Sequence, residues 1–235
     1  MTATITKTLG LLGGMSWEST LPYYRVINET VRERLGGLHS ARLLLYSVDF
    51  AEVERLQHAG DWDAAGALLG RAARSLRDGG AELLVICTNT MHKVADAVEA
   101  ASGLPLLHIA DPTGEAIRAA GLTKIGLLGT RFTMEQAFYR HRLIERHGLE
   151  VIVPDDGGRE LVHKVIYEEL CLGRIRDESR EGYRRIIAGL AARGAQGVIL
   201  GCTEIGLLIG PADVEVPLFD TTALHARAAA LASIG

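Results

Sequence analysis

The stretch LGLLG at residues 9–13 recurs almost unchanged as IGLLG at residues 125–129. Two further pairs follow in the same order: GAELLVICT at 80–88 resembles GAQGVILGC at 194–202, and LHIAD at 107–111 resembles PLFD at 217–220. Each run has the length and apolar character of a buried strand. Three matches in one order, at nearly constant spacing, indicate that the chain contains two similar halves.

The segments between these runs have the amphipathic pattern of helices. Strands are predicted at residues 8–12, 43–48, 83–86, 104–109, 125–128, 151–153, 198–200 and 216–219. Helices are predicted at residues 21–34, 62–78, 113–120, 134–147, 159–172 and 179–193, with another after Asp220. Strands that alternate with helices are typical of buried, mostly parallel sheets. Asp111 and Asp220 each follow a strand and precede a helix, so we expect both to cap those helices.

We therefore expect an α/β protein of two pseudo-symmetric lobes, each a mostly parallel sheet flanked by helices. The first lobe is predicted to comprise residues 1–112 and 221–235, and the second residues 113–220. Under this division the C-terminal helix packs back on the first lobe. Ligands of parallel α/β sheets bind beyond the carboxyl ends of the strands, so the active site is expected in the cleft between the lobes.

The composition excludes several classes of protein. The 235 residues are 48% hydrophobic and 23% charged, with a net charge of -4. Basic residues are scattered, so neither nucleic acid nor a membrane is expected as a partner. The first fourteen residues hold no apolar run long enough for a signal peptide or a membrane span, which predicts a cytoplasmic location. The glycines near residue 10 lack the dinucleotide-binding spacing, and no metal-binding motif occurs, so no cofactor or metal is expected.

Four loops follow predicted strands at their carboxyl ends. They are GGMSW at 13–17, CTNTMH at 87–92, GTRFT at 129–133 and GCTE at 201–204. Cys202 lies between a strand and the start of a helix, a position where the pKa of a thiol tends to fall; a buried structural cysteine is the alternative. Because side chains alternate along an extended chain, Cys87 should face away from Thr88. We interpret Cys87 and Cys171 as packing residues.

These loops resemble the aspartate/glutamate racemase family, and the resemblance covers essentially the whole chain. The matching motifs are GGMS at 13–16, NTMH at 89–92, GT at 129–130 with TM at 133–134, GCTE at 201–204 and the segment HKVIYEEL at 163–170. The resemblance implies a cofactor-independent amino-acid racemase, without pyridoxal phosphate or metal, that is commonly a homodimer. In this family two cysteines, one from each lobe, act on opposite sides of the substrate α-carbon.

One position departs from the family pattern. The family usually has a cysteine directly before Asn-Thr, where this chain has Thr88. The resemblance therefore implies Thr88 and Cys202 as the catalytic pair. A threonine hydroxyl is a poor general base because its pKa lies far above the working pH. We expect a strong enantiomer preference, with L-aspartate or L-glutamate as the favoured substrate.

Eight further residues are predicted to bind the substrate. The α-carboxylate is assigned to four residues of the strand-end loops, Asn89, Thr90, Thr130 and Thr203, with Met15 and Ser16 in the same pocket. Asp49 is assigned to the ammonium group, or else caps the helix that follows. Lys164, with His163 as a helper, is assigned by the resemblance to a side-chain carboxylate, or else lies on a solvated helix face. Phe50 stands near where relatives with acidic substrates often have arginine, which favours looser specificity.

Three alternative functions stay open. A broad-specificity amino-acid racemase would use the same acid–base groups. A decarboxylase of the arylmalonate type, on the same fold, needs only one thiol and hydroxyl donors, and Thr88 with Cys202 satisfies that requirement. A non-catalytic amino-acid-binding protein would keep the cleft without the chemistry.

Overall fold

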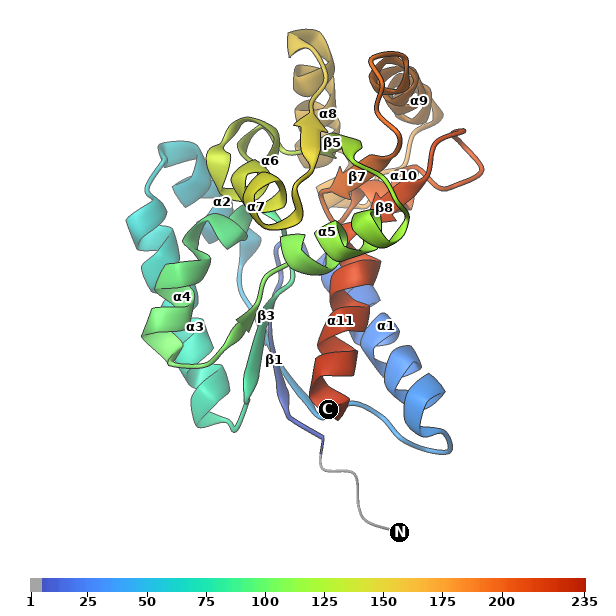
Figure 1. Ribbon diagram of the computed structural model, residues 1–235. Coiled ribbons are helices and arrows are strands. Elements are labelled where there is room, and N and C mark those ends of the chain that lie inside the picture. Colours follow the sequence, from blue (N-terminus) through green and yellow to red (C-terminus); the bar gives the residue numbers. More distant parts are fainter. Residues whose placement is uncertain (1–5) are drawn as a thin grey trace. The chain divides into compact units, whose positions relative to one another are not determined.

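The structure is a computed structural model that describes residues 6–235, and it divides into two compact units (Figure 1). Unit 1 extends to His108 and includes His225–Gly235, whereas unit 2 is Ile109–Leu224. These divisions lie four residues from the lobe boundaries that the sequence predicts. Each unit is described by itself below. Among the helices described, none has both the length and the apolar character needed to cross a bilayer.

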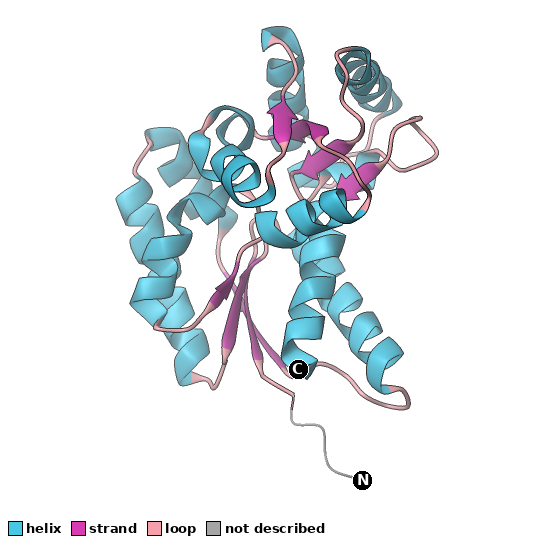
Figure 2. Cartoon of the chain, viewed as in Figure 1, coloured by secondary structure: helices cyan, strands magenta, loops and turns pink. Residues whose placement is uncertain are grey.

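Unit 1 is a four-stranded parallel sheet with helices on both faces (Figure 2). Its strands, in the order β2-β1-β3-β4, are β1 (Leu9–Gly13), β2 (Leu43–Ser47), β3 (Leu83–Ile86) and β4 (Leu106–Leu107). Its helices include α1 (Trp17–Leu35), α2 (Phe50–Ala59), α3 (Trp62–Asp78), the 3-10 helix η1 (Thr90–Val94) and α4 (Ala95–Ser102). Leu9 and Leu11 pack toward α1, while Leu12 and Leu84 pack toward α3, so successive side chains of the strands build two separate cores.

Unit 2 repeats the same sheet topology. Its strands, in the order β6-β5-β7-β8, are β5 (Lys124–Gly129), β6 (Glu150–Ile152), β7 (Val198–Gly201) and β8 (Leu218–Asp220), all parallel. Its helices are α5 (Ala110–Ala119), α6 (Arg131–Glu135), α7 (Ala137–His147), α8 (Asp156–Glu168), η2 (Leu170–Leu172), α9 (Asp177–Ala192) and α10 (Ile205–Leu208). The predicted α/β class and the pair of parallel sheets are confirmed.

The helix that follows the last strand of each sheet is assigned to the other unit. Helix α5 follows β4 but belongs to unit 2, and α11 (Thr221–Ile234) follows β8 but belongs to unit 1 from His225 onward. Ala226, Ala229 and Ala230 of α11 lie in the core that α1 forms with β1 and β3. The prediction that the C-terminal helix packs on the first half of the chain is confirmed.

The two aspartates predicted to cap helices behave differently. The carboxylate of Asp220 accepts the backbone N–H groups of Thr222 and Ala223 at 2.8 and 3.2 Å, so it caps α11 as predicted. The prediction for Asp111 is wrong, because α5 already begins at Ala110 and places this side chain within its first turn.

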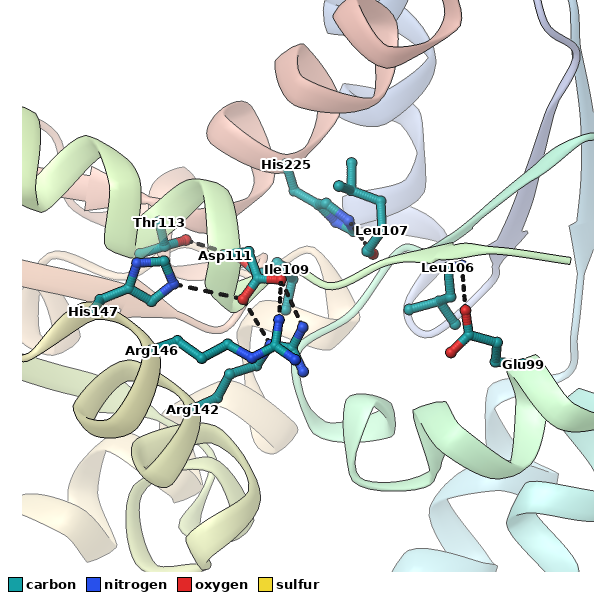
Figure 3. A network of polar contacts seen from close by, with 10 residues as sticks. All are labelled: Glu99, Leu106, Leu107, Ile109, Asp111, Thr113, Arg142, Arg146, His147 and His225. Atoms are coloured by element: carbon teal, nitrogen blue, oxygen red, sulfur yellow. Dashed lines mark hydrogen bonds and ion pairs between the residues drawn. The ribbon is translucent and has the colours of Figure 1, made fainter.

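Asp111 instead joins α5 to α7 in an ionic network (Figure 3). Its carboxylate accepts two hydrogen bonds from the Arg142 guanidinium, both at 2.6 Å. Arg146 and His147 lie 3.7 and 3.5 Å from the same carboxylate. Burial works against ionisation of Asp111, but the hydrogen bond and charge of Arg142 outweigh it and hold the pKa of that carboxyl below its usual range.

Some elements differ from their predicted bounds. The helix predicted at 134–147 is divided in two, because Gln136 has an extended backbone with ψ 151° between α6 and α7. Helix α4 is absent from the prediction, and the strand predicted at 104–109 is reduced to Leu106–Leu107. Both errors fall where a short alanine-containing segment meets an edge strand, and local apolar periodicity is weakest in such short elements.

Candidate active site

In unit 1 the predicted site residues gather at one edge of the sheet. Strands β1, β2 and β3 are neighbours and run parallel, so the loops that leave their carboxyl ends lie along the same edge. Met15 and Ser16 follow β1, Asp49 follows β2, and residues 88–90 follow β3. All of these side chains except that of Asp49 are buried.

The loop after β1 is held tightly against the sheet. Gly14 has φ +87°, and a Cβ atom built there would lie 2.7 Å from the Ser47 hydroxyl, so a larger residue does not fit. The Gly14 N–H donates to the Thr20 hydroxyl at 2.9 Å, and that hydroxyl donates to the Ser16 carbonyl at 2.9 Å. The first turn of α1 therefore fixes the backbone on both sides of Met15, at the end of β1.

The loop after β3 is supported by a buried histidine that the sequence analysis did not single out. The Nδ1–H of His92 donates to the Thr88 carbonyl at 2.8 Å. The His92 ring lies 4.5 Å from that of His108, measured between centroids. Nearby, His225 accepts from the Tyr23 hydroxyl at Nδ1 and donates to a backbone carbonyl through Nε2. Position 92 lies within the NTMH motif, and its spacing of four residues from Thr88 is the only signal of this role in the sequence.

Cys87 and Cys171 are packing residues, as predicted. Cys87 is fully buried in the core between α1 and β3, and burial raises the pKa of its thiol far above the ordinary value. Cys171 is half-buried against the core of unit 2. The Cys87 thiol therefore has neither the exposure nor the lowered pKa of a reactive thiol.

In unit 2 the loops after β5 and β7 are neighbours in the same way. The two strands approach closely, since a Cβ atom on Gly129 would lie 2.7 Å from the Gly201 carbonyl oxygen. Thr130 follows β5 and caps α6, with its hydroxyl accepting the Thr133 N–H at 3.3 Å. Cys202 and Thr203 follow β7, and all three predicted site residues are buried.

The Cys202 thiol faces a buried carboxylate. Its S–H donates to an oxygen of Glu204 at 2.9 Å, and the Thr203 hydroxyl donates to the same oxygen at 2.9 Å. The Glu204 side chain is only 1% exposed. Burial, followed by the negative charge of Glu204, raises the pKa of Cys202 well above its ordinary value.

The prediction that the Cys202 pKa is lowered is therefore wrong. The following helix, α10, has four residues, and the nearest charge to the sulfur is negative rather than positive. The raised pKa favours the protonated thiol, which donates a hydrogen bond to the Glu204 side chain. Glu204 is thus a functional candidate that the sequence analysis left out of the site, although its place two residues after Cys202 was a usable signal.

Two predicted binding residues, Asp49 and Lys164, have polar partners within their own units. The Asp49 carboxylate accepts the Ala51 N–H at 3.0 Å, so it caps α2, and the side chain is exposed. Lys164 lies on the exposed face of α8, with its ammonium group 3.9 Å from the Glu168 carboxylate. In their own units these residues occupy the positions of a helix cap and a solvated helix face.

The histidine beside Lys164 lies closer to the strand-end loops. His163 accepts the Arg131 N–H at 3.2 Å through Nδ1, and so it contacts the loop that follows β5.

Across residues 6–235, no group of three or more His, Cys, Asp or Glu side chains is arranged to hold a metal ion.

Comparison with known proteins gives a consistent relationship. Residues 12–229 match the family model described as Asp/Glu/Hydantoin racemase. A crystal structure of a protein from Yersinia pestis, provisionally named as an Asp/Glu racemase, is 63% identical, covers 97% of this chain and 100% of that chain, and gives a TM-score of 0.90. An aspartate racemase homologue from Pyrococcus horikoshii OT3 is 38% identical over 95% of this chain and 97% of that chain, with a TM-score of 0.80. The broad specificity amino-acid racemase RacX of Bacillus subtilis (strain 168) is 22% identical, over 93% of this chain and 95% of its own. A family model that spans nearly the whole chain, together with the buried thiol and hydroxyls at the strand ends, shows that the protein belongs to the Asp/Glu/hydantoin racemase family.

Proposed function

We propose that the protein is a cofactor-independent amino-acid racemase that acts on L-aspartate or L-glutamate. The observation that carries the proposal is the hydrogen bond from the buried Cys202 thiol to Glu204, at 2.9 Å. Racemisation requires a group that can both remove and return a proton at the α-carbon. A buried thiol paired with a buried carboxylate meets that requirement, since the proton has a local acceptor.

The proton balance of this pair is straightforward. Transfer of the S–H proton to Glu204 leaves a thiolate on Cys202 and a neutral carboxyl group on Glu204. The thiolate then takes the α-proton, which leaves an electron pair on the α-carbon, delocalised into the substrate carboxylate. A second proton delivered to the opposite side of the α-carbon gives the other enantiomer. Transfer of the Glu204 proton, through water, to the group that delivered the second proton restores the starting protonation of both groups.

We assign delivery of the second proton to Thr88. The Thr88 backbone carbonyl accepts a hydrogen bond from His92 at 2.8 Å, which helps to fix the position of this residue in the loop. A hydroxyl can donate a proton but is a weak base at neutral pH. The direction that needs Thr88 to remove a proton should therefore have the lower kcat, and a strong enantiomer preference in kcat is expected. Because the equilibrium constant of racemisation is 1, KM must differ by the same factor, so that kcat/KM is equal for the two enantiomers.

The remaining site residues are proposed to bind the substrate. The buried residues Asn89, Thr90, Thr130 and Thr203 supply N–H and hydroxyl donors for the α-carboxylate, where negative charge develops during the reaction, with Met15 and Ser16 beside them. Asp49 is proposed to bind the ammonium group. Lys164 is proposed to bind the side-chain carboxylate, in place of its weak surface contact with Glu168.

A broad-specificity amino-acid racemase is the second candidate. RacX, which carries that description, shares 22% identity over most of both chains. Phe50 begins α2 at the position where the sequence analysis expects arginine in relatives with acidic substrates, and a phenylalanine cannot pair with a carboxylate. An enzyme of this kind turns over neutral amino acids at rates similar to those for aspartate and glutamate.

The deciding experiment is a panel of L-amino acids in D₂O, followed by NMR for loss of the α-proton signal without added pyridoxal phosphate. A racemase replaces the α-proton with deuterium and generates the D form, and Cys202→Ser abolishes exchange. The control is Ser75→Ala, which removes an exposed hydroxyl of α3 that donates to the Arg71 carbonyl and should leave the rate unchanged. Binding without exchange would identify an amino-acid-binding protein, and release of CO₂ from an arylmalonate would identify a decarboxylase. Either outcome contradicts the proposal.

We also propose that the protein is a homodimer. The family resemblance supports this state.

A further inference from the structure

The turn that follows β7 contacts the first turn of α11 on both sides of the thiol. The Thr221 hydroxyl donates to the Leu200 carbonyl at 2.8 Å, one residue before the strand ends. The Thr222 hydroxyl lies 3.5 Å from the Thr203 carbonyl, which is the outer limit of a hydrogen bond. Both threonine side chains are buried, and all four residues belong to unit 2. The first turn of α11 therefore supports the backbone immediately before and after the residue that carries the thiol.

Asp220 makes a third contact with the same turn. A Cβ atom built on Gly206 would lie 2.9 Å from the Asp220 carboxylate, so α10 packs directly against that carboxylate. The carboxylate is fixed in its turn, because it accepts the backbone N–H groups of Thr222 and Ala223. We define the 220–222 brace as Asp220, Thr221 and Thr222. The brace contacts the turn after β7 at both of its ends and between them.

These contacts bear on the separation between the thiol and the carboxylate. Cys202 and Glu204 are two residues apart on the braced turn, so the 2.9 Å between their side chains depends on the backbone that joins them. A buried carbonyl that loses its donor is costly, and the chain around it shifts to find another partner. Loss of the Thr221 hydroxyl would therefore move the backbone that carries both groups.

The matching segment in the other half of the chain has different contacts. In the internal repeat Asp111 aligns with Asp220, so Pro112 and Thr113 align with the two threonines of the brace. Proline has no hydroxyl to donate. The Thr113 hydroxyl donates to the Ile109 carbonyl at 3.0 Å, at the start of its own helix. The threonine pair therefore belongs to the half that carries the thiol and its carboxylate, which favours a role in their placement over a general requirement of the fold.

We propose that the 220–222 brace positions the Cys202 thiol against the Glu204 carboxylate, with Thr221 as its principal contact. This inference rests on the proposed function, in which a proton passes between these two groups. The brace acts through the backbone of the turn, so Thr221 is a positioning residue that does not touch the substrate. A small misplacement of an acid–base group slows a proton transfer strongly. The brace should therefore affect kcat much more than KM.

The first test removes the hydroxyl of Thr221 while keeping its shape. In Thr221→Val, kcat for L-aspartate should fall about tenfold, with KM changed much less. Thr221→Ser keeps the hydroxyl and should recover most of the wild-type rate. The matched control is Thr30→Val, which removes a buried hydroxyl that donates to the Val26 carbonyl of α1, also at 2.8 Å. Urea unfolding should show a similar loss of stability in the two valine variants, whereas only Thr221→Val should lose kcat.

The pKa of the Cys202 thiol gives a second measurement that does not depend on the reaction. Burial and the charge of Glu204 raise this pKa, so a turn that relaxes away from Glu204 should lower it. Iodoacetamide labelling of the Cys202 peptide across a range of pH, followed by mass spectrometry, should show the decrease in Thr221→Val but not in Thr221→Ser or Thr30→Val. In the Glu204→Gln background, Thr221→Val should change the pKa much less, because the contact that the brace positions is already lost.

A second variant disturbs the same contact from α10. Gly206→Ala places a methyl group against the Asp220 carboxylate and should also lower the pKa of Cys202. Its control is Gly189→Ala in α9, where a Cβ atom would meet no other atom within 4 Å. A wild-type pKa of Cys202 in Thr221→Val, a serine variant as impaired as the valine variant, or full additivity with Glu204→Gln would each overturn the proposal. A wild-type protein that racemises no amino acid would instead refute the proposed function, because the labelling experiment still shows whether the brace positions the thiol.

Discussion

Replacement of Glu204 by glutamine should make the Cys202 thiol easier to ionise and yet slow the reaction. The carboxylate accepts the thiol proton at 2.9 Å and its charge contributes to the raised pKa of Cys202. The amide has nearly the same shape but no charge, so the pKa of the thiol should fall. The amide also cannot take up the proton, so the local acceptor in the proposed mechanism is lost.

The magnitude follows from the kind of contact. A positioned acid–base group contributes about 10²- to 10⁴-fold to a proton-transfer reaction. Because Glu204 is only 1% exposed, solvent is a poor substitute for it. We expect kcat for the racemisation of L-aspartate to fall about 10²-fold or more in Glu204→Gln, with KM changed much less.

Two assays separate these effects. The pH dependence of iodoacetamide alkylation, with the Cys171→Ala background to remove the half-buried thiol, reports the pKa of Cys202. Polarimetry or α-proton exchange reports kcat. The matched control is Glu169→Gln, which alters a carboxylate bonded to the Ser179 hydroxyl at 2.6 Å and should leave kcat close to that of the wild type. If Glu204→Gln racemises at the wild-type rate, or if its thiol is harder to ionise than before, Glu204 is not the proton acceptor.

Three further outcomes are expected. Because Arg142 lowers the pKa of Asp111, their contact stabilises the fold above about pH 4, the pKa of an unfolded aspartate, and this stabilisation is lost as the pH falls through the folded-state value. Urea unfolding of Arg142→Met should show a loss of about 1–3 kcal/mol at pH 7, and a gap from the wild type that stays constant at pH 3 would be inconsistent with this linkage. His92→Phe removes the donor to the Thr88 carbonyl, so the free energy of unfolding should fall by about 1–3 kcal/mol and kcat should fall with it; unchanged kcat would show that the loop needs no such support. Lys164→Met should raise KM for aspartate roughly tenfold with little effect on L-alanine, and an equal effect on both would identify Lys164 as a surface residue only.

The direction of the enantiomer bias depends on the unequal acid–base strengths of the two catalytic groups. The Cys202 thiol has the Glu204 carboxylate as its proposed proton acceptor. Thr88 has only a hydroxyl group, and His92 contacts its backbone carbonyl rather than that hydroxyl. Thr88→Cys would supply a second ionisable group at the same position. We expect this variant to raise kcat in the slow direction more than in the fast one, which initial rates at saturating concentrations of each enantiomer would show.

Much of the fold could be predicted from local sequence alone. The apolar runs at 9–13 and 125–129 form the central strands of two sheets with the same order of strands, and the helix predicted at 62–78 has the bounds of α3. These features are local, because a strand or helix that buries one face must carry apolar residues at a fixed period. The loops at the strand ends could be located for the same reason, since parallel strands end at a common edge.

Other properties were decided only when distant parts of the chain came together. In the sequence Asp111 has the position expected of a helix N-cap, but its carboxylate accepts a hydrogen bond from Arg142 of another helix. No local sequence pattern predicts that contact. The pKa of Cys202 is raised, whereas the sequence predicts that it is lowered, because the depth of burial and the orientation of the Glu204 side chain depend on packing. Charge and desolvation act through space over a few ångströms, so a thiol's chemistry is set by its neighbours in the folded chain, which the order of residues does not specify.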